Sequence, residues 1–230
     1  MNDSDDSVRL NKFLALHTGT SRREADDLIA KNKVHINGTL AIMGARVGAN
    51  DVVTVSGKEI AAQTAHVYLA LNKPTNYVCS RKQQGDSPTI YDLVPQEYHT
   101  LKPVGRLDRD SSGLILLTND GDFAQRMTHP SYRKVKQYEV TLGRLLEPLH
   151  QQMISDFGVD LEDGKSQLTL ERTTDDRTQW IVTMSEGRNR QIRRTFAALG
   201  YTVVKLHRTH FGPYALGELA SGKFEIVTQK

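Results

Sequence analysis

Asp108 is the side chain whose type and position best suit catalysis. It lies in a short polar segment, residues 104–113. The next four residues, 114–117, are all apolar and are closed by a Thr-Asn-Asp-Gly turn, which predicts a buried strand. A loop that enters a buried strand is a common position for a catalytic group, because the scaffold holds it. Asp108 is therefore either a catalytic carboxylate or a turn cap and surface partner of Arg106 or Arg109.

A cationic stretch near the C-terminus could serve such a site. Residues 185–210 contain six Lys or Arg against one Glu. Ile192, Phe196 and Leu199 recur at helical spacing and Gly200 follows as a cap, so the arginines crowd the first turn of an amphipathic helix. Cations are unfavourable there unless an anion neutralises them.

The anion could be a phosphate or a carboxylate of the protein. Phosphates would bind Arg188, Arg190 and Arg194. Our hypothesis for Arg193 is that it pairs with Asp108 and keeps that carboxyl group ionised when a substrate excludes water. A surface helix that carries arginines without a ligand is the alternative.

Tyr138 lies on an alternating strand that follows the basic run 133–136, and it shares a face with Val140. A tyrosine on a strand commonly fills the core, so the isolated pattern favours packing over chemistry.

The N-terminal part predicts two short helices followed by strands. Leu10, Phe13 and Leu14 have helical spacing, and Ser21 with Glu24 forms a capping box. Alternation in residues 34–36 then leads to an Asn-Gly hairpin signal. Basic residues gather near the second helix, where phosphate oxygens could bind, although a solvated charged face is the alternative.

These residues resemble the S4 RNA-binding domain. The resemblance spans about fifty residues and rests on the motifs Arg9–Leu14, Ser21–Ala25 and Val34–Gly38. It implies an RNA-facing surface on the second helix. The expected RNA contacts are Lys12, Ser21, Arg22, Arg23 and Lys33.

Composition sets the broad class. The chain has 230 residues, 38% hydrophobic and 25% charged, which suits a soluble protein with one or two cores. Cys79 is the only cysteine, so a disulfide within the chain and a four-cysteine zinc site are excluded. We find neither a bilayer-length apolar run nor a signal peptide and therefore expect a cytoplasmic protein.

The order of elements predicts an α+β protein with a small helix and strand domain followed by a mixed, mainly antiparallel β-sheet with packed helices. We expect a disordered tail at residues 1–7, the S4-like domain at 8–56, a linker at 57–65 and a catalytic domain at 66–230. Helices are expected at 122–128 and 145–154. No coiled-coil pattern is present, so a monomer is expected.

Five ordered segments resemble the bacterial ribosomal-RNA pseudouridine synthases of the small-subunit synthase A type. They are residues 71–74, 105–121, 127–130, 138–140 and 186–194. With the S4-like start, the resemblance covers nearly the whole chain.

The resemblance implies a catalytic aspartate at Asp108, an active-site tyrosine at Tyr138 and a basic partner at Arg193. Ile192 matches an apolar residue near the uracil. Within the matching motifs, Arg106 and Lys73 are also expected to bind substrate. After Lys73-Pro74 the family commonly has any residue and then glycine, whereas this chain has Asn76. Asn tolerates left-handed backbone, so we expect the loop shape to survive.

The implied reaction breaks the N1–C1′ bond of a uridine, turns the base and rejoins it through C5. It needs no oxidant or water, so we expect no cofactor and no metal. The base must first leave its stack, at a cost of about a few kcal/mol. Asp108 would attack C1′ or take the C2′ proton, and Tyr138 would stack on the uracil or assist at C5. The expected partner is ribosomal RNA or a pre-ribosomal particle, with no protein partner and no membrane.

Two alternatives remain. One is a non-catalytic S4-type RNA-binding or ribosome-assembly protein. The other is a metal-dependent phosphodiesterase that uses Asp108 and Asp110 as ligands, although no His or Glu motif completes such a site at usual spacings.

Overall fold

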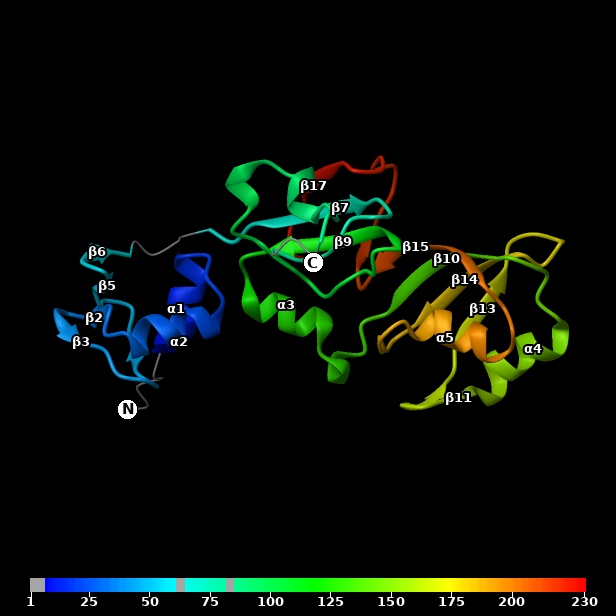
Figure 1. The fold of residues 1–230 in the computed structure, drawn as a ribbon, viewed down its shortest axis with the longest axis horizontal. Coiled ribbons are helices and arrows are strands. Elements are labelled where there is room, and N and C mark those ends of the chain that lie inside the picture. The colour runs from blue at the N-terminus through cyan, green and yellow to red at the C-terminus, as the bar shows by residue number, and fades with distance from the viewer. Residues whose placement is uncertain (1–6, 61–64, 82–84) are drawn as a thin grey trace. The chain divides into compact units, whose positions relative to one another are not determined.

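The computed structural model describes residues 7–60, 65–81 and 85–230 (Figure 1). Within these residues the chain forms two compact units. One extends to Val67 and includes Asn119–Gly121, and the other comprises Tyr68–Thr118 and Asp122–Lys230. Residues 1–6 of the tail expected at 1–7, and residues 61–64 in the middle of the expected linker, lie outside the described residues.

The N-terminal unit combines helices with small antiparallel sheets. Strand β1 pairs with β4, and the other strands are arranged in the order β3-β2-β5-β6. The elements are α1 (Leu10–His17), α2 (Arg22–Ala30), β1 (Val8–Arg9), β2 (Val34–Ile36), β3 (Thr39–Leu40), β4 (Arg46–Val47), β5 (Val53–Val55) and β6 (Lys58–Glu59).

Helix α2 begins as its sequence predicts. Ser21 Oγ accepts the Glu24 N–H at 3.1 Å, and the Glu24 carboxylate accepts the Ser21 N–H at 2.7 Å. This capping box satisfies two backbone donors of the first turn. The Asn37-Gly38 hairpin is also confirmed, because both residues have the positive φ, 50° and 79°, that such a turn requires.

The N-terminal sheet continues beyond the boundary expected at Ser56. Ser56 and Gly57 form a second turn with positive φ, and β6 then pairs with β5. The first residues of the expected linker, 57–65, therefore belong to a hairpin. The Ser56-Gly57 pair, at the expected boundary between domain and linker, forms the turn of this hairpin. The buried core of this unit is formed by Leu10, Leu14, Ala25, Ile29, Val34, Ala41, Val47 and Val53.

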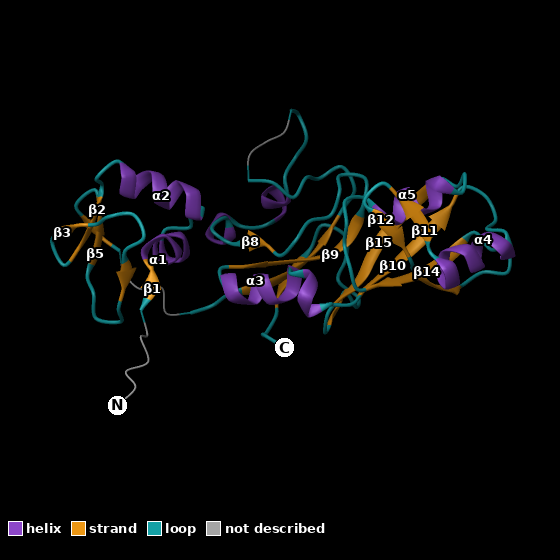
Figure 2. Ribbon diagram, turned by 90° about the horizontal axis from the view of Figure 1, so that it is seen from below, coloured by secondary structure: helices purple, strands orange, loops and turns teal. Residues whose placement is uncertain are grey.

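The second unit is built on one large, twisted sheet (Figures 1 and 2). Its strands are β7 (Tyr68–Lys73), β8 (Lys102–Pro103), β9 (Ser112–Thr118), β10 (Lys136–Leu142), β13 (Thr169–Arg172), β14 (Gln179–Met184), β15 (Val203–Phe211), β16 (Tyr214–Ala215) and β17 (Phe224–Ile226). Strands β11 (Val159–Leu161) and β12 (Gly164–Ser166) form a separate hairpin. The helices are α3 (Gly121–Thr128), α4 (Pro148–Gln152) and α5 (Gln191–Ala198), with 3-10 turns at Ile90–Leu93, Gln96–Tyr98 and Pro130–Tyr132.

The strand order β13-β14-β10-β15-β9-β7-β17 confirms the mixed, mainly antiparallel sheet. Strands β15 and β9 pair in parallel through His207–Ser112 and Arg208–Gly113, whereas the other neighbours in this order are antiparallel. A parallel neighbour requires a long connection, and here β10 to β14 and α5 fill it. The run 114–117 is buried in β9, as predicted.

Helix α3 occupies the predicted residues and buries Phe123 and Met127 against the β7 and β9 face. The helix expected at 145–154 is shorter and begins at Pro148, which suits the first helical position because its missing N–H needs no partner there. A π-helical turn, Met153–Phe157, follows it. Among the described residues, no helix is long and apolar enough to span a membrane.

Candidate active site

The loop that carries Asp108 is held by the last residue of β7 and by the segment that follows this strand. Lys73 Nζ donates to the Ser111 carbonyl at 2.7 Å, and the Asn76 N–H donates to the Arg109 carbonyl at 2.7 Å. The Cys79 thiol lies 3.3 Å from the Leu107 carbonyl and accepts the Leu107 N–H at 3.4 Å. Alternate carbonyls of the loop, at 107, 109 and 111, are thus fixed from one side. Asn76 has a φ of 70°, so the left-handed backbone expected at this departure from the family pattern is confirmed.

Lys73 is not placed as expected for a substrate ligand. Its side chain is fully buried, and Nζ donates to the Pro74 and Ser111 carbonyls. Burial lowers the Lys73 pKa to about 8, against the opposing pull of nearby groups that include Asp110 and Asp108. The structure therefore corrects this assignment: Lys73 braces the loop, and a buried ammonium with two carbonyl acceptors leaves little reach toward a phosphate.

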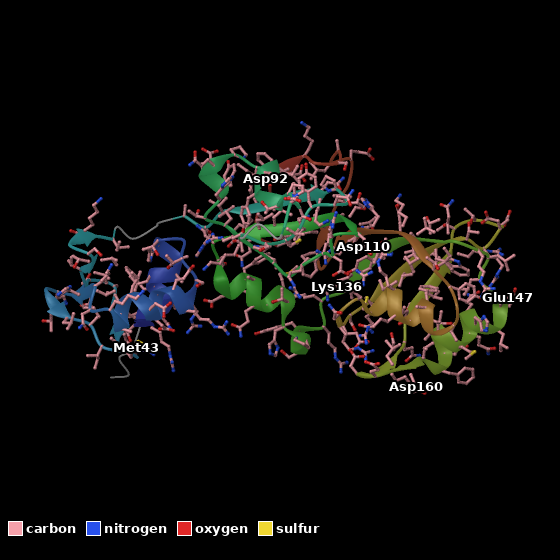
Figure 3. All side chains as sticks on the ribbon, in the orientation of Figure 1. Met43, Asp92, Asp110, Lys136, Glu147 and Asp160 are labelled. Carbon is pink, nitrogen blue, oxygen red and sulfur yellow. The ribbon has the colours of Figure 1, made fainter. Side chains whose placement is uncertain are left out.

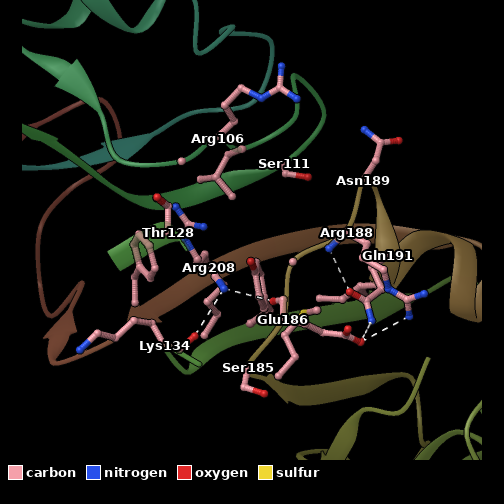
Figure 4. A pocket seen from close by; sticks show the side chains of 18 of the residues that line it. Arg106, Ser111, Thr128, Lys134, Ser185, Glu186, Arg188, Asn189, Gln191 and Arg208 are labelled. Atoms are coloured by element: carbon pink, nitrogen blue, oxygen red, sulfur yellow. Dashed lines mark hydrogen bonds and ion pairs between the residues drawn. The ribbon is translucent and has the colours of Figure 1, made fainter. Parts of the chain in front are cut away.

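Above the loop lies a cavity of about 460 Å³ (Figure 4). This volume falls in the usual range for ligand sites. The cavity brings together sequence-predicted residues from three separate segments, namely Arg106, Asp108, Tyr138, Arg188, Arg190 and Ile192. Its walls also contain residues that the sequence did not single out, including Lys136, Glu186, Gln191, Arg208 and Phe211.

Asp108 lies beside an arginine pair at the rim of the cavity. Arg190 donates two parallel hydrogen bonds to the Asp110 carboxylate, at 2.9 and 2.8 Å, and its Nη1 lies 3.5 Å from Asp108 Oδ2. The hydrogen bonds from Arg190, followed by the charge of Arg193, hold the Asp110 pKa below its ordinary value. Asp110 lies on the loop before β9 (Figure 3).

The expected pairing of Arg193 with Asp108 is not observed. Arg193 Nε lies 3.2 Å from Asp110 Oδ2, and its terminal nitrogens donate to the carbonyls of Asp110 and Val203. The ion pair to Asp108 comes from Arg190 instead. Arg190 is the residue just before α5, in a left-handed conformation, and this backbone turn directs its side chain toward the loop. A helical wheel could not have shown this, because Arg190 is outside the helix.

Arg188 and Arg194 are held by the β11–β12 hairpin. Arg194 donates to both oxygens of Asp163, at 3.0 and 2.7 Å, and Arg188 donates to Asp163 Oδ1 and to the Gly164 and Lys165 carbonyls. Arg188 also lies beside Glu186, to which Gln191 donates (Figure 4). Arg194 does not line the cavity. The anion that neutralises these two arginines is therefore a carboxylate of the protein.

The floor of the cavity is formed by the paired strands β10 and β15. Tyr138 is directly opposite Arg208, and Lys136 is opposite Phe211. Directly opposite residues of an antiparallel pair share one face of the sheet. Lys136 Nζ donates to the Lys134 and Glu186 carbonyls, and burial, followed by the charge of Arg208, lowers the Lys136 pKa. Tyr138 is thus buried as packing predicts and also faces the site.

In the N-terminal unit, Arg22, Arg23 and Lys33 are exposed, and Arg22 donates to Asn11 at 3.3 Å. Lys12, on α1, is half-buried. Ser21 acts as the cap of α2, so its hydroxyl has a structural partner whether or not RNA binds. Arg22 and Arg23 lie at the start of α2, as the sequence implied, whereas Lys33 follows the end of that helix.

A helix and strand unit with exposed cations, joined to a sheet that presents a carboxylate in a basic cavity, agrees with the expectation of an enzyme that acts on RNA. A sequence model of the RNA pseudouridylate synthase family matches residues 67–198, and the S4 domain model matches residues 8–53. The chain belongs to the RNA pseudouridylate synthase family and carries an S4 domain.

Named relatives match along the chain. The ribosomal small subunit pseudouridine synthase A of Pasteurella multocida is 39% identical, covering 96% of this chain and 96% of its own length. The ribosomal large subunit pseudouridine synthase B of Pseudomonas aeruginosa is 35% identical over 96% of this chain, which spans 60% of that relative. A crystal structure of a pseudouridylate synthase matches with a TM-score of 0.68 at 35% identity, covering 96% of each chain.

Proposed function

We propose that this protein isomerises a uridine of ribosomal RNA to pseudouridine and that Asp108 is the catalytic carboxylate. The observation that carries the proposal is the position of Asp108: its carboxylate lines a cavity shared with Tyr138 and Ile192 and lies 3.5 Å from Arg190. Attack at C1′ or removal of the C2′ proton requires a carboxylate, and this one forms an ion pair with the Arg190 guanidinium.

The other cavity residues divide by position. Tyr138, on the floor, stacks on the flipped uracil or assists at C5, and Ile192 packs against the base. Arg106 and Arg190 are exposed in part at the rim, where they bind phosphates of the flanking nucleotides. Arg193 acts indirectly, because it holds Asp110 and so the loop. Arg188 and Arg194 bind the β11–β12 hairpin, and Arg188 also lines the cavity.

Ribosomal RNA is the proposed substrate because the relatives that cover most of this chain are named for it. They include enzymes of both the small and the large subunit, so the proposal covers the RNA of either one. The exposed Arg23 and Lys33 of the S4 domain support docking on an RNA backbone. We propose further that the protein works in the cytoplasm as a monomer, on ribosomal RNA or a pre-ribosomal particle.

The decisive experiment compares Asp108→Asn with wild type. Pseudouridines are mapped in total rRNA of cells with the gene, without it, and with each variant. The variant is expected to abolish one or a few modifications while RNA affinity stays within about threefold, a change of under 1 kcal/mol. Asp175→Asn, in an exposed turn away from the cavity, is the matched control and should keep full activity.

Two outcomes would contradict the proposal. If no pseudouridine depends on the gene but RNA binding persists, the protein is a binding or assembly factor. If Asp108→Asn retains the modification, another group is catalytic. A metal-dependent phosphodiesterase is disfavoured by geometry, since Arg190 and Arg193 already surround the Asp110 carboxylate. No cluster of three possible ligand residues occurs in the described parts of the chain.

A further inference from the structure

Arg208 is a buried cation in the cavity floor that lacks a counter-charge. Arg208 is only 3% exposed, and its Nε donates to the Leu114 carbonyl at 2.8 Å. Among the described residues, this is the one hydrogen bond of the guanidinium, and buried Nη2 has no partner. No carboxylate of the described chain forms an ion pair with it. An unpaired buried charge is energetically costly, and a bound ligand with an acceptor oxygen would offset this cost.

The guanidinium is also held rigidly. Its central carbon lies 4.7 Å from the centroid of the Phe211 ring, and the Nε hydrogen bond fixes the plane. Gly113, in β9 just after the loop that carries Asp108, packs against the Arg208 backbone. Lys136, the other cation of the floor, directs its ammonium group to backbone carbonyls. Arg208 is therefore the preorganised donor of this floor.

The position of Arg208 in the cavity floor suits the binding of a base better than the binding of a phosphate. It is opposite Tyr138 in the strand pair, and both residues line the cavity with Ile192 and Phe211. Aromatic and aliphatic surfaces suit a planar ring, whereas the exposed rim arginines suit phosphates. The base also becomes an anion in the proposed reaction. When the C1′–N1 bond breaks, its electron pair stays on N1 and the charge spreads to the ring carbonyl oxygens.

We propose that Arg208 binds the extruded uracil and stabilises the uracilate anion, its free N–H group donating to a ring carbonyl oxygen. The proposal rests on the proposed function. The anion then turns and C5 bonds to C1′; on the attack route this breaks the ester bond between C1′ and Asp108 and frees the carboxylate, and on the other route Asp108 returns its proton to C2′. The C5 proton then passes to a base in the cavity and N1 takes up a proton, so that atoms and charge balance. This assignment holds whether Asp108 attacks C1′ or removes the C2′ proton, because both routes release the same anion.

The test substitutes Arg208→Gln. The Gln Nε2 occupies the position of the arginine Nε, so the bond to Leu114 can persist while both terminal nitrogens are lost. We expect kcat to fall by about 10²-fold or more, as when one donor to a developing anion is removed, with a much smaller change in KM. Sub-denaturing guanidinium should restore part of the activity by refilling the vacated site, and sodium at equal ionic strength should not.

Arg177→Gln is the matched control. Arg177 also donates from Nε to a carbonyl, that of Leu146 at 2.6 Å, and its guanidinium carbon lies 5.3 Å from the Trp180 ring centroid. It does not line the cavity. This variant should lose stability without a specific loss of kcat or rescue by guanidinium.

A leaving-group substitution tests the charge directly. An RNA with 5-fluorouridine at the target carries a base whose anion is more stable, so C1′–N1 cleavage by Arg208→Gln should be less impaired than with uridine in single turnover. An equal loss with both substrates, or a loss confined to KM, would overturn the proposal and indicate a structural or phosphate-binding role. Unchanged kcat with uridine would overturn it as well.

A measurement on the wild-type enzyme guards against misfolding of the variant. With an RNA that is abasic at the target, barbiturate, a planar pyrimidine anion at neutral pH, should bind more tightly than neutral uracil. Equal or weaker binding would contradict the proposal. If wild type forms no pseudouridine at all, the proposed function fails instead, so the two failures are distinguishable.

Discussion

Lys73 and Asp110 are charged residues that shape the site from outside the cavity. Neither lines it, yet Lys73 holds the Ser111 carbonyl and Asp110 holds Arg190 and Arg193. Each has a pKa displaced from its ordinary value, which makes its contribution to stability measurable as a function of pH.

For Lys73 the sign follows from a pKa lowered to about 8 in the folded protein, compared with 10.5 ordinarily. Between these values the unfolded chain binds a proton that the folded chain has released, so stability rises with pH. Relative to Lys73→Met, wild type should gain about 3 kcal/mol of unfolding free energy over this range. Urea titrations from pH 7 to 10.5 measure it, with the exposed Lys223→Met as control. A parallel pH dependence in wild type and Lys73→Met would contradict the buried-ammonium assignment.

Asp110 should show the opposite dependence. Its pKa is lowered in the folded state, chiefly by hydrogen bonds from Arg190, so its stabilisation is present above the ordinary carboxyl pKa of about 3.9 and is lost as the pH falls through the lower folded value. The stability difference between wild type and Asp110→Asn should stay constant from neutral pH to about pH 4 and shrink below it. Acid unfolding monitored by circular dichroism tests this, with exposed Asp160→Asn as reference. If the stability difference between wild type and Asp110→Asn grew as the pH fell, the stabilisation of Asp110 by Arg190 would be refuted.

At the scale of elements, the contact between β9 and β15 decides where the catalytic loop lies. Gly113 has a φ of 105°, and a Cβ placed on it would lie 2.2 Å from the Arg208 carbonyl oxygen. Only glycine permits this approach of the strands. The same contact places Arg208 beneath the loop that carries Asp108.

Gly113→Ala should therefore destabilise the protein by more than about 4 kcal/mol or prevent folding, since both backbone strain and a backbone clash must be relieved. Gly121→Ala is the matched control: it lies at the start of α3, and a Cβ there meets no atom within 4 Å. It should be neutral or stabilising by up to about 1 kcal/mol. Thermal melts of both variants provide the comparison. Equal melting temperatures would show that the sheet can yield at this position.

Local signals explain which elements the sequence could predict. The capping box at Ser21, the Asn37-Gly38 turn and the left-handed Asn76 each depend on a few adjacent residues, and the structure confirms them. The partner of Arg193 depended instead on how a helix and a loop eighty residues apart meet, and the prediction was wrong. Arg208 was missed because strand alternation shows which face a residue lies on but not that the face is a cavity floor.

At the scale of the whole molecule, RNA affinity should depend on charges distributed over both units. Arg23, exposed at the start of α2, forms no ion pair with any described residue. If it contacts one phosphate, Arg23→Gln should reduce the slope of log affinity against log salt by about 0.7 to 0.9 without changing kcat. Filter binding across a salt series measures the slope, and Lys58→Gln, on the distal strand β6, is the control. An unchanged slope would remove α2 from the RNA-binding surface.

The parallel pair between β9 and β15 joins residues about 95 positions apart in the chain, and β15 alone connects β9 to the β10 side of the sheet. Hairpins on either side of this pair can form from residues that are close in sequence. The β9–β15 pair (the seam) instead closes a long loop, so its formation carries the full conformational-entropy cost of closing that loop. Because the cavity lies across the seam, it exists only once both sides have docked. Refolding chains that have formed their strands but not the β9–β15 pair would therefore be well structured and inactive. Newly made protein would gain its activity at the last step of folding.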